Sequence, residues 1–479
     1  MAERRRIGES LTGAAWIAVP LLLAWLLLQR PINDSDIYWQ AALGDLALRE
    51  GAPISREVLA PAYLGTPSPP LSALAQVILA LVRDWAGWRG VQVFDAALCA
   101  GGFFFAGLAA RRRGAAMVTT AAALVLAGGI ALSFLSLRPQ SWSVLGLGLL
   151  LWILTWRGKV RHRLLAGAAV LVLWQNMHPS VMIAALYLGA RAVPGWLAVL
   201  RSRNLTIIPW PETVLAVIAF AAQFATPAGL DVLSVSLANQ KMSVFMAATE
   251  WLPVSDPGAR DLHPLLLTLH AGVLAMIAAN WRRIDLGEAL GAVVFLALSF
   301  VWARFMLPWA IALVPMLAVR ESAEAQGRGE GWGLVAGFAA IAALAVLKIP
   351  AATWPLAPES AVAHLKAMPQ GGRIFANSYF GGIVAEETGG KWQSFYDGRY
   401  YRFSEDEWRL YNRTFGGEAG LAEVEARFHP DAWLIAPNDA GRLVKDLRAD
   451  SARWIEVSGD DRALLFVRAN WMASASDPR

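Results

Sequence analysis

The chain has 479 residues, of which 56% are hydrophobic and only 16% are charged, and its mean hydropathy is +0.44. This composition is too apolar for an ordinary soluble domain and indicates a membrane protein. The net charge of +5 does not indicate nucleic-acid binding, because the basic residues form short clusters between apolar segments, as membrane topology requires. A single cysteine, Cys99, excludes a disulfide framework and a thiolate metal site.

The apolar segments predict a multi-pass helical membrane protein. A helix that crosses about 30 Å of hydrocarbon needs roughly 20 apolar residues. We expect about eleven spans, near residues 11–29, 90–110, 115–137, 141–156, 164–177, 180–200, 212–226, 264–280, 287–303, 305–320 and 332–348. The segment 71–85 is short and follows a proline-rich stretch, so we predict an interfacial helix there. The first span, after MAERRR, has no small-residue cleavage site behind it and is interpreted as a retained signal anchor.

The basic clusters predict the orientation. Lys and Arg are enriched in cytoplasmic loops. With a cytoplasmic N-terminus, the strong basic clusters all fall on the cytoplasmic side: 111–113, 157–163, 201–204, 280–283 and 320–328. The external loops are then 30–89 and 226–263, and the C-terminus is extracytoplasmic. We therefore predict a multi-pass protein of the plasma (inner) membrane.

Beyond about residue 350 the composition becomes that of a soluble domain. SAVAHLKAM predicts a helix, GRIFANS and KWQSFYDGR predict strands, and SEDEWRLYNRTF opens with Ser404 as a helix N-cap. Helix, strand, helix and two strands follow. We therefore expect two domains, a transmembrane domain over 1–349 and an extracytoplasmic α/β domain over 350–479.

Six polar residues lie on the predicted external face. Charged groups at membrane depth are costly and are usually functional. The candidates are Asp34, Asp36, Arg138, His178, Glu250 and Arg304. Arginines bind phosphate through charge-assisted hydrogen bonds, and aspartates serve as general bases or hold a divalent cation. The set indicates a phosphate-linked, anionic substrate. Whether a metal takes part stays open.

Each candidate also has a structural interpretation. DSD (34–36) is a natural helix cap, and Arg138 and Arg304 have side chains long enough to extend to lipid headgroups. His178 precedes a proline in a loop, and Glu250 adjoins an interfacial tryptophan. For Asp-Gly-Arg at 397–399 a structural turn is favoured over chemistry. The convergence of the six on one face favours a site.

Several segments resemble polytopic glycosyltransferases of the GT-C type, in a bacterial and largely uncharacterised branch. The first external loop, DSDIYWQAALGDLALREGAPIS, carries the family's Asp-x-Asp, aromatic pair, Gly and Gly-x-Pro. LRPQSW, WQNMHPS, ATEWLP and WARFMLP follow in the family's order. RIFANSYFGGIVAEETGGKWQSFYDGRYY is similar to its extracytoplasmic domain. The resemblance covers nearly the whole chain, although each motif is short.

The resemblance implies an inverting transferase that takes a sugar from a polyprenyl-phosphate carrier at the outer face. It implies Asp34 or Asp36 as the base or metal partner, and Arg138 and Arg304 as ligands of the lipid phosphate. The acceptor is a glycan, a lipid or a protein, and nucleic acid is not a partner. The chain departs from the family at Gln40, where relatives often have His, and at Ser55 and Arg56, where they have an Asp after the Gly-x-Pro. The loop also ends in the proline-rich TPSPP instead of an aromatic and acidic sequence. Two alternatives remain: a non-catalytic relative in the cell envelope, and a transporter of lipid-linked substrates.

Overall fold

The computed structural model describes residues 15–32, 34–256, 264–320, 357–419, 421–438 and 441–471. The chain divides into two compact units that are each described separately. The helical unit comprises the described residues of Met1–Pro31, Ala86–Gly229 and Ala248–Ala351, and the mixed unit comprises those of Ile32–Trp85, Leu230–Ala247 and Ala352–Arg479. The mixed unit thus joins the predicted C-terminal domain with parts of both predicted external loops.

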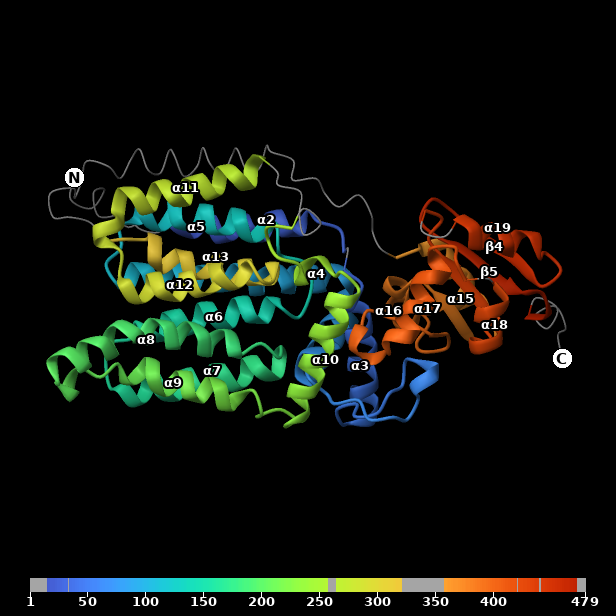
Figure 1. The fold of residues 1–479 in the computed structure, drawn as a ribbon, viewed down its shortest axis with the longest axis horizontal. Coiled ribbons are helices and arrows are strands. Elements are labelled where there is room, and N and C mark those ends of the chain that lie inside the picture. Colours follow the sequence, from blue (N-terminus) through green and yellow to red (C-terminus); the bar gives the residue numbers. More distant parts are fainter. Residues whose placement is uncertain are drawn as a thin grey trace. The chain divides into compact units, whose positions relative to one another are not determined.

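The helical unit consists of helices that run side by side (Figure 1). Its elements are α2 (Ala18–Leu28), the part of α4 (Ala73–Arg112) from Ala86 onward, α5 (Met117–Leu132), α6 (Ser141–Leu154), α7 (Val160–Met177), α8 (Met182–Ser202), α9 (Trp210–Ala222), α11 (Pro264–Asn280), α12 (Leu286–Ser299) and α13 (Met306–Leu317). Each lies where the sequence predicts a span. The predicted span 332–348 lies outside the described residues.

Helix α13 forms the centre of this unit. All its residues from Met306 to Leu317 are buried, and it packs against α5, α6, α11 and α12. Its sequence, MLPWAIALVPML, is apolar on every side. A helix of this kind belongs in an interior rather than on a surface.

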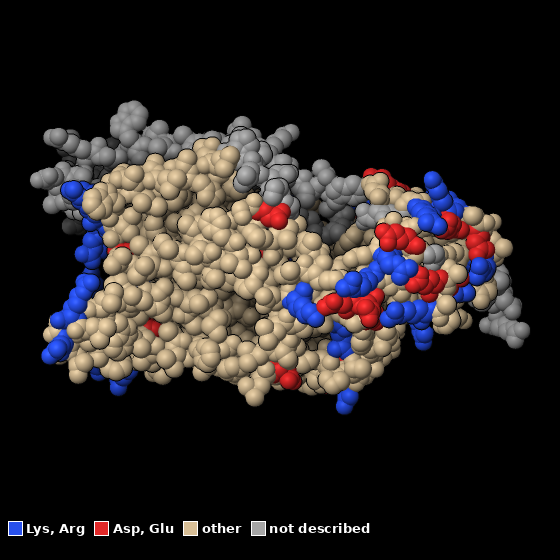
Figure 2. Space-filling model, in the orientation of Figure 1, with Lys and Arg blue, Asp and Glu red and all other residues tan. Residues whose placement is uncertain are grey.

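The outer surface of the helical unit is apolar. Large side chains such as Leu21, Leu165, Val217 and Leu274 are exposed on α2, α7, α9 and α11. In Figure 2 its sides carry few charges, whereas Lys and Arg gather at one end. Such a surface is unfavourable in water and suits lipid. Among the described helices, α4 and α8 are long and apolar enough by composition to cross a bilayer, and the others are shorter. The count of eleven spans stays a prediction.

Helix α4 joins two segments that the sequence analysis separates. The helix covers both the predicted interfacial segment 71–85 and the predicted span 90–110, and Gly87 interrupts it with φ 64° and ψ −172°. Glycine adopts this positive φ without the strain that a side chain would cause.

The mixed unit contains a five-stranded sheet. The strands β1 (Arg373–Ala376), β2 (Gln393–Ser394), β3 (Ala432–Ile435), β4 (Trp454–Gly459) and β5 (Leu464–Arg468) lie in the order β2-β1-β3-β5-β4. β1 pairs in parallel with β2 and β3, and β5 pairs antiparallel with β3 and β4. Every residue of β3 is buried, as expected for a strand covered on both faces.

The helices of this unit are α3 (Asp36–Glu50), the first part of α4, α10 (Asp231–Phe245), α15 (Glu359–Ala367), α16 (Ser378–Glu387), α17 (Glu405–Phe415), α18 (Leu421–Phe428) and α19 (Gly441–Ala449). Ser404 caps α17 in a capping box with Glu407, as the sequence predicts. The predicted order of helices and strands is confirmed except that α16 lies between β1 and β2. The sequence analysis missed α10 and α16. It assigned α3 to an external loop and gave DSD (34–36) a helix cap as its structural interpretation.

Two helices of the helical unit cross at glycines, and this crossing is testable. A Cβ on Gly148 of α6 would overlap the backbone oxygen of Gly102 of α4. Small residues let helix backbones approach this closely in membranes. We expect Gly148→Ala to destabilise the protein by about 1–3 kcal/mol through overpacking.

The measurement is the apparent melting temperature of purified protein in detergent. The control is Gly128→Ala in α5, where an added Cβ meets no atom within 4 Å. Equal melting temperatures for the two variants would contradict the close crossing.

Candidate functional site

The two predicted aspartates lie at the start of α3. Asp36 is its first residue, and the backbone N–H of Asp36 donates to Oδ1 of Asp34 at 3.0 Å. Asp34 is buried. Carboxylates at a helix N-terminus are stabilised by its partial positive charge. DSD therefore begins a helix, and this local structure holds whichever role the carboxylates have.

The Asp36 carboxylate has a specific donor on its own helix. Nε1 of Trp39 donates to Oδ1 of Asp36 at 3.1 Å. The two residues are three positions apart and therefore share one helix face. Trp39 is thereby a second member of the candidate site beside the aspartate.

A glycine pair in α16 brings α3 close to the turn at 397–399. A Cβ on Gly382 would lie 3.0 Å from the Trp39 backbone nitrogen and 3.1 Å from the Ser35 oxygen, and one on Gly381 would overlap the Tyr396 oxygen. Both glycines are buried in α16. The absence of a side chain at Gly382 thus lets α3 lie against α16, and its absence at Gly381 lets the segment at 396–397 lie against the same helix.

The Asp-Gly-Arg turn meets Asp36 directly. A Cβ on Gly398 would overlap Oδ1 of Asp36. The guanidinium of Arg399 lies over the Trp39 ring, 5.8 Å from its centroid. Two motifs that the sequence analysis considered separately, DSD and DGR, thus adjoin within the mixed unit.

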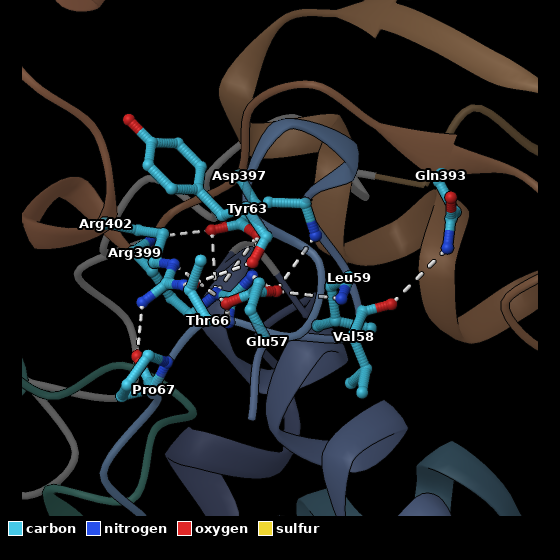
Figure 3. Close-up of polar contacts among 11 residues, drawn as sticks. Glu57, Val58, Leu59, Tyr63, Thr66, Pro67, Gln393, Asp397, Arg399 and Arg402 are labelled. Carbon is cyan, nitrogen blue, oxygen red and sulfur yellow. Dashed lines mark hydrogen bonds and ion pairs between the residues drawn. The ribbon is translucent and has the colours of Figure 1, made fainter. Parts of the chain in front are cut away.

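Arg399 is the centre of a buried ion cluster (Figure 3). Its Nη1 and Nη2 donate to the two oxygens of Glu57 at 2.8 and 2.9 Å, and its Nη2 also donates to Asp397 at 2.6 Å. Arg402 forms an ion pair with Glu57 at 3.1 Å. The backbone N–H groups of Leu59 and Ala60 donate to Glu57 Oε1 at 2.8 and 2.9 Å.

The cluster shifts the ionisation of its members. Burial raises the pKa of Glu57, but the charge and hydrogen bonds of Arg399 outweigh burial, and the pKa lies below its usual value. Burial lowers the pKa of Arg399, yet Asp397 and Glu57 raise it overall. Glu57 and Arg399 are therefore both charged at neutral pH.

In the helical unit, Arg138 and Glu250 form an ion pair. Nη1 of Arg138, from the turn between α5 and α6, lies 2.7 Å from Oε2 of Glu250, and about a third of each side chain is exposed (30% and 32%). Glu250 belongs to a short 3-10 helix, Thr249–Trp251. The partners are 112 positions apart in the sequence.

Arg304 lies beside this pair and is held by stacking. Its guanidinium sits 4.3 Å from the centroid of the Trp251 ring, next to Glu250, and its charge acts on Glu250 together with that of Arg138. Among the interactions of the described residues, Arg304 has no hydrogen bond or ion pair of its own. The Arg304 side chain is half-buried, and a guanidinium over an aromatic face is attracted by the negative face of the ring.

His178 lies in the same neighbourhood. Its Nδ1 is 2.8 Å from Oγ of Ser180 and 3.1 Å from Oγ of Ser143, and Trp174 Nε1 donates to the same Ser180 hydroxyl at 2.9 Å. His178 interacts electrostatically with Arg304, Glu250 and Arg138. The structure therefore brings together four of the six predicted residues, from four separate segments of the helical unit.

The predicted set thus divides between the units. Arg138, His178, Glu250 and Arg304 form the cationic cluster of the helical unit, and Asp34 and Asp36 belong to the mixed unit. Two guanidiniums against one carboxylate give the cationic cluster a net positive charge. No group of three or more His, Cys, Asp or Glu side chains that could hold a metal ion occurs among the described residues.

Sequence reasoning missed Trp39, Glu57 and Arg399 as members of a site. Trp39 was noted only as part of an aromatic pair, and Arg399 only in a turn. Nothing in the sequence around Glu57 indicates a functional residue, because SREVL is an ordinary loop sequence. Its partner lies 342 positions further along the chain.

Comparison with known proteins supports the fold. No protein-family model matches the chain, and no curated protein matches its sequence. Among solved structures, the apo crystal structure of the Archaeoglobus fulgidus oligosaccharyltransferase is similar, with a TM-score of 0.51 and 12% identity over 96% of this chain and 74% of that one. The chain therefore has an oligosaccharyltransferase-like fold, which agrees with the GT-C-like fold that the motifs imply.

The buried cluster predicts loss of stability in acid. The folded pKa of Glu57 is depressed, so its stabilising contribution is complete above the unfolded pKa of about 4.3 and is lost as pH falls through the folded pKa. At neutral pH, Glu57→Ala leaves Arg399 partly uncompensated and should cost about 3–5 kcal/mol.

The measurement is the melting temperature of the full chain between neutral pH and acid. The control is Glu456→Ala, which removes an exposed pair with Arg448 and should cost about 1 kcal/mol or less. A Glu57→Ala melting curve with the same position and pH dependence as the control would refute the assignment.

Proposed function

We propose that the protein is an integral membrane glycosyltransferase. It transfers a sugar from a polyprenyl-phosphate-linked donor to a glycan, lipid or protein acceptor at the outer face of the membrane. The observation that carries the proposal is the cationic cluster of Arg138, His178, Glu250 and Arg304, built from four segments of the helical unit. The oligosaccharyltransferase-like fold supports it.

The chemistry of the cluster suits a phosphate leaving group. The acceptor oxygen or nitrogen attacks the anomeric carbon, the bond from that carbon to the phosphate oxygen breaks, and the phosphate leaves with the electron pair. Arg304 and Arg138 offset the charge that develops on it. Glu250 orients Arg138 through their ion pair, and Trp251 holds Arg304 by stacking.

The aspartates supply the proton acceptor. In an inverting displacement, the acceptor loses its proton as it attacks, and a carboxylate takes that proton. We assign this role to Asp36 or Asp34. Asp36 is the stronger candidate because its carboxylate is oriented by Trp39, whereas Asp34 is buried and accepts from the backbone of Asp36.

The departure at Gln40 has a structural explanation. Gln40 is buried, and its Oε1 accepts from Nε2 of Gln76 at 2.8 Å. The residue thus joins α3 to α4 within the mixed unit.

Loss of charge at the proposed groups should abolish transfer. We expect Asp36→Asn to lower kcat by about 10²–10⁴ through loss of the base, and Arg304→Ala to lower it by about 10²–10³ through loss of stabilisation of the leaving phosphate. The assay measures labelled sugar transferred from polyprenyl-phosphate donors by the purified protein, with envelope extracts as acceptor.

The control for this assay is Arg448→Ala, at an exposed residue of α19, which should leave the rate unchanged. Wild-type rates in both site variants would refute the site. No transfer by the wild type from any donor would favour a non-catalytic relative. Movement of a lipid-linked sugar from one leaflet of a vesicle to the other, without transfer, would favour a transporter.

The orientation of the protein is a separate prediction. We expect reporters fused after Arg113 and Arg203 to be cytoplasmic, and one fused at Arg479 to be extracytoplasmic, because basic clusters stay on the cytoplasmic side. Paired alkaline phosphatase and fluorescent-protein fusions measure this. A cytoplasmic reporter at Arg479 would contradict transfer at the outer face.

A further inference from the structure

We propose that Trp39 and Gly398 are positioning residues for the Asp36 carboxylate, and that the Asp-Gly-Arg turn is the device that holds this arrangement. The proposal rests on the proposed function, because it gives Asp36 the role of proton acceptor. It assigns a task to a turn that sequence reasoning interpreted as purely structural.

The first support is the hydrogen bond within α3. The indole Nε1–H of Trp39 reaches Oδ1 of Asp36 at 3.1 Å. A carboxylate rotates broadly about its last torsion unless something holds it. A donor on one oxygen fixes the plane of the group and therefore the direction of the other oxygen.

The second support is that Trp39 is itself held. Arg399 lies over its ring at 5.8 Å, and Arg399 is bound by both oxygens of Glu57 and by Asp397. Gly382 lets the Trp39 backbone lie against α16. The indole is thus oriented by a guanidinium that its own ion pairs prevent from moving.

The third support is the space at Gly398. A Cβ there would overlap Oδ1 of Asp36, the same oxygen that accepts from Trp39. Gly398 has no positive φ, so conformational freedom does not explain why glycine stands there. The requirement is room for the carboxylate.

Positioning matters because a proton acceptor acts only within hydrogen-bond reach. A displacement of about 1 Å can lower a rate by about 100-fold. Residues that orient the ligands of a metal site contribute about 10- to 100-fold to activity, and we expect the same order for residues that orient a proton acceptor. Their loss lowers kcat and leaves donor binding unchanged, since the lipid donor does not contact them in this proposal.

The kinetic experiment compares two matched tryptophans in the full-length protein. Trp39→Phe removes the bond to Asp36, and Trp392→Phe removes an indole bond of equal length, 3.1 Å, to the Leu365 carbonyl. We expect kcat to fall about 10- to 100-fold in Trp39→Phe, with KM for the donor unchanged, and to stay at the wild-type value in Trp392→Phe.

The second experiment measures the contact without relying on activity. Gly398→Ala should lower the apparent melting temperature, and Asp36→Ala in the same chain should restore it, because the overlapping oxygen is gone. The matched control is Gly371→Ala, whose Cβ would overlap the Lys391 oxygen. Asp36→Ala should not restore the stability of that variant.

The outcomes separate the two proposals. An active wild type with equal kcat in Trp39→Phe and Trp392→Phe would overturn the positioning role and leave the glycosyltransferase assignment intact. The positioning role would also be overturned if Asp36→Ala failed to restore the melting temperature of the Gly398→Ala variant. Absence of transfer by the wild type would overturn the proposed function, and the positioning role would fall with it.

Discussion

A buried guanidinium is the constraint on which the mixed unit depends. Arg399 is 2% exposed, and a charge at such a place is stable only when ion pairs and hydrogen bonds replace its water. Glu57 and Asp397 meet that requirement. Because Glu57 comes from a loop near the N-terminus and Arg399 from the C-terminal region, this one cluster ties together segments that are 342 positions apart. The N-terminal loop is therefore part of the unit that contains the sheet.

Within the segments that this ion cluster joins, glycines determine how closely α3, α16 and the turn at 397–399 approach one another. Gly381 and Gly382 sit between the turn at 396–397 and the backbone of α3, and Gly398 leaves room for the Asp36 carboxylate. A Cβ at any of the three would push one segment away from the next. The ion pairs of Arg399 thus determine which segments meet, and the glycines determine how near they lie. Both are needed to place Asp36, the first residue of α3, against the turn at 397–399.

Much of the fold could be predicted from local pattern. Apolar runs of sufficient length located the helices of the helical unit, and the Ser404 capping box located the start of α17. α10 and α16 were missed because their sequences carry little amphipathic signal: SYFGGIVAEE contains two glycines, which disfavour a helix unless packing requires them. In the site, the four residues of the cationic cluster were predictable since charge in an apolar chain stands out. Glu57 was not, because its importance comes from a partner far along the sequence.

The contacts around Asp36 form a chain in which each member orients the next. The ion pairs of Arg399 with Glu57 and Asp397 hold its guanidinium. That guanidinium lies over the ring of Trp39, and the Trp39 indole donates to the Asp36 carboxylate. In the helical unit, the guanidinium of Arg304 lies over the Trp251 ring. An aromatic residue thus contacts a carboxylate in one unit and a guanidinium in the other, and these are the two groups to which the proposed function assigns proton transfer and stabilisation of the leaving phosphate.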